Sequence, residues 1–72
     1  MNLRKYIDQL DPEELVDYAD RCRIAQSYLR LHIKYASKDP SVSLMKSLAR
    51  ESNGNVSISD VLEHFGVIEK LS

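Results

Sequence analysis

The 72-residue sequence is long enough for one small domain and too short for two. Apolar residues make up 43% and charged residues 29%, a balance typical of a folded globular protein rather than a disordered chain. A single cysteine, no apolar run near the roughly 18 residues of a membrane helix, and no signal-type N-terminus argue against a disulfide framework, a membrane protein or a secreted one. We therefore expect a protein of the reducing cytoplasm.

The net charge of −1 hides an uneven distribution. Residues 1–20 carry two basic and six acidic side chains. Residues 21–50 carry seven basic and one acidic side chain, and residues 51–72 carry one basic and four acidic side chains. Nucleic-acid-binding domains are often basic throughout, whereas here the positive charge is confined to the middle of the chain. This pattern predicts that any binding to nucleic acid relies on shape and dimerisation more than on bulk attraction.

The first half of the chain is predicted to begin with two helices. Residues 2–9 have apolar side chains at helical spacing and form a short scaffold helix. The second helix covers residues 12–22, where Asp11 is the N-cap, Pro12 takes the first helical position and Glu14 lies three residues after the cap.

A third helix is predicted after a short turn. The apolar pattern loses its phase over residues 23–25 and restarts over residues 26–35. Ala19 is small where the two helices meet, Ile24 fills the turn, and Leu29 anchors the third helix beneath the second. This spacing predicts a helix-turn-helix motif.

Two further helices complete an all-α, five-helix chain. Ser41 is the N-cap of the fourth, which Gly54 is expected to end, and the Asn-Gly signal there indicates a turn, since the flanking segments do not alternate like strands. Ser57 and Asp60 form a capping box for the fifth helix, which ends near Gly66.

The outward face of the third helix carries side chains suited to reading bases. Glutamine pairs with adenine, arginine with guanine, serine with several base edges, and an aliphatic group contacts the thymine methyl in the major groove. No acid lies on this face. The candidate base-reading residues are Gln26, Ser27, Arg30, Leu31 and Lys34.

A second set of side chains is placed to contact the DNA backbone, where contacts position the protein without specifying a sequence. The candidate phosphate-contacting residues are Arg23, Tyr28, Lys38, Ser41 and Lys46. A charge-rich, solvated loop is the competing interpretation. Tyr18, Tyr28 and Tyr35 are expected at helix flanks, with their hydroxyls reaching water or a phosphate.

The sequence resembles a known protein family over about residues 3–65. The quoted segments are LDPEE at residues 10–14, YADRC at 18–22, YLR at 28–30, PS at 40–41 and NGNVS at 53–57. The chain resembles the DNA-binding domains of phage Cro and repressor proteins, and more closely the YdaS-type, Cro-like regulators of prophages. The resemblance implies a compact lambda-repressor-like bundle. Arg23 departs from the glycine of many members, and a positive φ there costs about 1 kcal/mol.

The sequence contains no motif typical of a catalytic site or of a metal site. The sequence has no Gly-rich phosphate loop, no Ser/His/Asp grouping and no paired carboxylates in an evident pocket. His32, His64 and Cys22 are too scattered for a metal cluster, and Cys22 is predicted to lie in the core. We expect no enzymatic activity, no cofactor and no small-molecule ligand.

The sequence thus predicts a Cro-like repressor that binds operator DNA as a homodimer. One recognition helix contacts too few bases for useful affinity, so a second subunit is expected. The fifth helix and the tail form the expected dimer surface, with Phe65, Val67, Ile68 and Leu71. The alternative is a protein-interaction module, such as an antitoxin-like or antirepressor partner. Activation instead of repression has the same fold and stays open.

Overall fold

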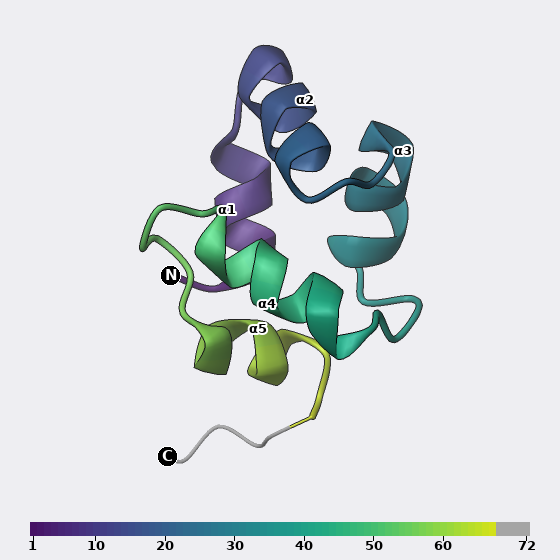
Figure 1. The fold of residues 1–72 in the computed structure, drawn as a ribbon, viewed down its shortest axis with the longest axis vertical. Coiled ribbons are helices and arrows are strands. Elements are labelled where there is room, and N and C mark those ends of the chain that lie inside the picture. The colour runs from purple at the N-terminus through teal and green to yellow at the C-terminus, as the bar shows by residue number, and fades with distance from the viewer. Residues whose placement is uncertain (68–72) are drawn as a thin grey trace.

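The computed structural model describes residues 1–67. The helices are α1 (Leu3–Gln9), α2 (Pro12–Arg21), α3 (Gln26–Tyr28), the π-helix η1 (Leu29–Ile33), α4 (Val42–Arg50) and α5 (Ile58–His64). Because α3 runs directly into η1, the described residues form five helical segments and no strand (Figure 1). The predicted all-α chain of five helices is confirmed.

Side-chain caps begin the helices where the sequence predicts. The Asp11 carboxylate accepts from the Glu14 amide at 2.8 Å, and the Ser57 hydroxyl accepts from the Asp60 amide at 3.0 Å. Both caps are reciprocal capping boxes. The hydrogen bond that the Ser57 amide donates lowers the pKa of the Asp60 carboxyl below its ordinary value. Ser41 caps α4 as predicted.

The third helix is shorter than the predicted range 26–35 and changes its geometry partway. From Leu29 the backbone makes wide π-type turns, so that the Lys34 amide donates to the Leu29 carbonyl at 3.0 Å. The helix ends at Ile33, and Ala36 then takes a left-handed φ of 52° that a right-handed helix cannot continue. A π turn rotates the following residues away from the positions of a regular α-helix.

The fourth helix also ends earlier than predicted, at Arg50 rather than at Gly54. Ser52 is buried, and its hydroxyl accepts from the Val56 amide at 3.0 Å while lying 2.7 Å from the Ala49 carbonyl oxygen. Such side-chain hydrogen bonds compete with helical ones and fold the backbone into a turn. Gly54 lies within this turn, with a φ of 86° that glycine adopts without strain.

One apolar core joins all the helices. Its buried members are Leu3, Tyr6, Ile7, Tyr18, Ala19, Cys22, Leu29, Ile33, Met45, Leu48, Val56 and Val61. The predicted contact of the second and third helices is confirmed, because Ala19 and Leu29 are buried and Ile24 is half-buried against the core. In Figure 1, α2 and α3 lie at one end of the molecule and α5 at the other, with α4 between them.

The expectation that the Tyr18 hydroxyl reaches water or a phosphate is wrong. Tyr18 is fully buried, its ring meets the Tyr6 ring edge-on, and its hydroxyl donates to the Leu48 carbonyl oxygen of α4. Burial raises the pKa of the Tyr18 hydroxyl far above its ordinary value. Tyr18 therefore ties α2 to the end of α4 through the core.

Candidate nucleic-acid interface

The turn between α2 and α3 has the hydrogen bonds of a Schellman motif. The Arg23 amide donates to the Asp20 carbonyl and the Ile24 amide to the Ala19 carbonyl, both at 3.0 Å. Arg23 has a φ of 60°, which confirms the positive φ expected at this position. This motif favours glycine, since any other side chain meets the backbone there. An arginine in this place is a local source of strain.

Replacing Arg23 by glycine is expected to stabilise the protein by about 0.5–1 kcal/mol. The left-handed conformation costs a non-glycine residue about 1–2 kcal/mol, and the greater freedom of glycine in the unfolded chain returns part of this. Urea unfolding measures the change. Arg30→Gly is the matched control, because it makes the same substitution inside a helix, where glycine costs about 1 kcal/mol. The urea midpoint of Arg30→Gly should therefore fall. A lower midpoint for Arg23→Gly would contradict the strain.

The exposed side of the third helix carries most of the predicted base-reading residues. Ser27, Arg30 and Leu31 are exposed, with Leu31 at 57% of its full accessibility, and Gln26 is half-buried at the helix start. The ion pairs formed within residues 1–67 do not involve Arg30. The Arg30 guanidinium and the Leu31 side chain are thus presented to solvent side by side.

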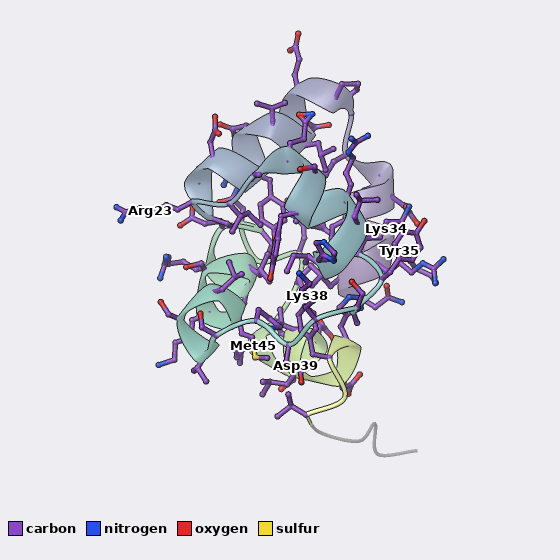
Figure 2. The ribbon with its side chains drawn as sticks, turned by 90° about the vertical axis from the view of Figure 1, so that its right-hand side faces the viewer. Arg23, Lys34, Tyr35, Lys38, Asp39 and Met45 are labelled. Atoms are coloured by element: carbon purple, nitrogen blue, oxygen red, sulfur yellow. The ribbon has the colours of Figure 1, made fainter. Side chains whose placement is uncertain are left out.

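Lys34 lines one groove together with Arg30 and Leu31, but its charge is already paired within the protein. Its ammonium forms an ion pair with Asp8 of α1 and lies 5.2 Å from the centre of the Tyr35 ring. The hydrogen bond with Asp8, together with the charge of that carboxylate, raises the pKa of Lys34 above its ordinary value. Figure 2 shows Lys34 and Tyr35 beside α1 at one edge of this side, and Arg23 projecting from the opposite edge.

Two of the predicted phosphate-contacting residues line one hollow. Arg23 and Ser41 face an open space of about 600 Å³ between the α2–α3 turn and α4, together with Ser43, Ser47 and Arg50. Arg21 and Arg50, which also border it, both pair with Glu51 at 3.5 and 3.0 Å. Within residues 1–67 these ion pairs leave Arg23 as the arginine of the hollow that has no carboxylate partner.

The other candidate phosphate contacts are not gathered there. Tyr28 is half-buried against the core, with its ring 5.2 Å from the His32 ring. Lys38 is exposed in the segment before α4, and Lys46 is exposed on α4 itself. Figure 2 shows Lys38 below the third helix, in the loop that leads to α4.

The candidate dimer residues are described only in part. Phe65 is half-buried against the core, and Val67 is exposed at 58%. Ile68 and Leu71 lie outside the described residues. The structure therefore places one exposed aliphatic residue at the end of α5, while Phe65 contributes to the core.

Reactive or metal-binding chemistry has no support within residues 1–67. Cys22 is buried, and burial raises the pKa of its thiol to about 11, which makes it a poor nucleophile. No group of three potential ligands could hold a metal ion in this part of the chain. A helix with the length and apolarity to cross a membrane is likewise absent from the described residues.

Two contacts made by the third helix and the residue that follows it were not predicted from the sequence. Asp8 engages Lys34 from 26 positions earlier, and the Nε2 atom of His64 lies 2.6 Å from the Ile33 carbonyl oxygen. Neither pairing has a local pattern that predicts it.

No family model, curated protein or solved structure matches the chain.

Proposed function

We propose that this protein is a sequence-specific DNA-binding regulator whose α2 and α3–η1 act as a helix-turn-helix. In this proposal the third helix enters the major groove, as the resemblance to Cro-like repressors implies. The observation that carries it is the exposed pair Arg30 and Leu31 on a short helix anchored from behind by the buried Leu29. Arginine reads guanine and an aliphatic side chain contacts the thymine methyl, so neighbouring bases can be distinguished.

The hollow beside the α2–α3 turn supports a separate backbone contact. Arg23 brings an uncompensated positive charge to it, and the N-terminus of α4, capped by Ser41, lies on the same hollow. Helix N-termini favour anions, and phosphate contacts set the orientation of a protein on DNA. Lys34 is assigned to holding α1 against η1 instead of reading a base, because Asp8 neutralises it.

A homodimer that represses by occupying its operator follows from the size of the reading surface. One short helix offers few base contacts, and two-fold dimers read two half-sites to gain affinity and discrimination. Val67, together with Ile68 and Leu71, is proposed for the dimer contact. A repressor of this kind would block polymerase and need no ligand.

Selection of bound sequences from random double-stranded DNA tests the proposal directly. We expect enrichment of a palindromic site, followed by a steep loss of affinity as salt rises, with a slope of about 0.9 per phosphate contact. Arg23→Gly should reduce that slope by about one contact per protomer while the preferred sequence stays unchanged. No enrichment at any salt concentration would overturn DNA binding.

A groove beside the reading helix favours a second candidate function, that of a protein-interaction module such as an antirepressor or antitoxin-like partner. The groove, of about 390 Å³, is lined by apolar and aromatic side chains, of which Leu31 and Tyr35 are more than half exposed, and by the charged side chains of Asp8, Arg30 and Lys34. An apolar protein interface of this kind should respond little to salt. The salt series therefore separates the two candidates.

A further inference from the structure

The end of the reading helix has unusual backbone geometry. The Lys34 amide donates to the Leu29 carbonyl and the Ser37 amide to the His32 carbonyl, both across five residues, at 3.0 and 3.1 Å. Wide turns of this kind are rare and less stable than α-helical ones, and the last carbonyls of a helix have no partner within the helix. The η1 segment therefore depends on other groups to keep its shape.

One such group comes from the opposite end of the fold. His64, the last residue of α5, places Nε2 2.6 Å from the Ile33 carbonyl oxygen. Since a carbonyl oxygen only accepts, Nε2 carries the hydrogen and donates it. The His64 ring is held edge-on against the Phe65 ring, with 4.8 Å between the ring centres and 82° between their planes. The contact between the His64 and Phe65 rings therefore orients Nε2 toward the Ile33 carbonyl oxygen.

Like the ion pair between Lys34 and Asp8 of α1, this hydrogen bond ties the end of the helix to a distant element. The Ala36 amide also donates to the Ile33 carbonyl, and His32 Nδ1 lies 2.8 Å from the Ser37 hydroxyl, but both contacts are made within the same short segment. Local contacts shape the turn without fixing it to the rest of the molecule. The bond from His64 joins η1 to α5, which itself packs on α4 and α1.

We propose that His64 is a positioning residue that holds the end of η1 against α5 and so sets how Arg30 and Leu31 are presented to DNA. The effect on DNA rests on the proposed function. The effect on the helix does not.

Two variants of the full chain separate the hydrogen bond from simple packing. His64→Leu keeps an apolar side chain of similar volume but has no donor. His64→Gln keeps an amide nitrogen at nearly the reach of Nε2 and therefore retains the donor. Hydrogen exchange of the Lys34, Ala36 and Ser37 amides reports on the end of the helix, and the amides of α4 serve as an internal reference for global stability.

In His64→Leu we expect exchange at these three amides to be about three- to tenfold faster, beyond any change in α4. His64→Gln should restore it to within about twofold. Affinity for the selected operator should fall severalfold in His64→Leu and recover in His64→Gln. Equal changes in η1 and α4, or no recovery with glutamine, would overturn the positioning role. Faster local exchange in a protein that binds no DNA would uphold that role and overturn the proposed function instead.

Discussion

Replacing Arg30 by alanine is expected to remove most discrimination between the operator and unrelated DNA. A bidentate contact between arginine and guanine contributes about 1–3 kcal/mol, and a symmetric dimer loses about twice that free energy, because each protomer loses the same contact. Arg30 is exposed, so truncating it should leave the free energy of unfolding within about 0.5 kcal/mol of the original value. Competition binding with the selected operator and a scrambled duplex measures the change.

Lys46→Ala is the matched control for this experiment. Lys46 is exposed on α4 and is proposed to contact only phosphate. Its loss should weaken binding to both duplexes alike and reduce the salt dependence by about one contact per protomer. If Arg30→Ala behaves in the same way as Lys46→Ala, then Arg30 contacts the backbone and the proposed reading face is wrong.

Tyr18→Phe is expected to destabilise the protein clearly, although it removes a single atom. The phenylalanine ring keeps the edge-on contact with Tyr6, but the buried Leu48 carbonyl loses the donor that the Tyr18 hydroxyl supplies. A buried acceptor without its partner costs about 1–3 kcal/mol. Each kcal/mol lowers the Tm of a domain of this size by about 4–8 °C. Urea and thermal unfolding of the two proteins measure the difference.

Tyr35→Phe removes the same atom from an exposed position. Tyr35 is 54% exposed and its ring lies against Arg4 and Lys34, contacts that phenylalanine retains. We expect a change below about 0.5 kcal/mol. Equal stability losses in Tyr18→Phe and Tyr35→Phe would show that the hydrogen bond to Leu48 contributes nothing.

The hollow near Arg23 connects the stability of this protein with its proposed binding to DNA. Arg23→Gly should make the protein more stable and its DNA binding weaker, since the strained φ and the positive charge belong to the same residue. A gain in stability together with a loss of DNA affinity is expected when a strained residue is retained for function. The physical cost of an arginine in the turn is then matched by a contact that glycine cannot make.

The starts of the helices and the composition of the core could be predicted from the sequence alone. A capping box such as Asp11 with Glu14 involves residues three positions apart, so its geometry is set by neighbours along the chain. The contact between Ala19 and Leu29 was predictable for a similar reason, because apolar spacing on two adjacent helices specifies which sides must meet. The positive φ of Arg23 was expected only from the resemblance, because many members of that family have glycine at this position.

The final shape of the candidate interface was decided by tertiary contacts. Lys34 was predicted to read a base, and the fold pairs its charge with Asp8 of α1. The Tyr18 hydroxyl was expected near solvent, yet it donates to the Leu48 carbonyl oxygen. His64 reaches Ile33 from 31 positions away. Charges and hydrogen-bond donors pair with whatever the fold brings within about 3 Å, and this depends on packing between helices rather than on spacing along one of them. Local sequence therefore determined which helices form, whereas packing between distant helices determined which of their polar side chains remain exposed.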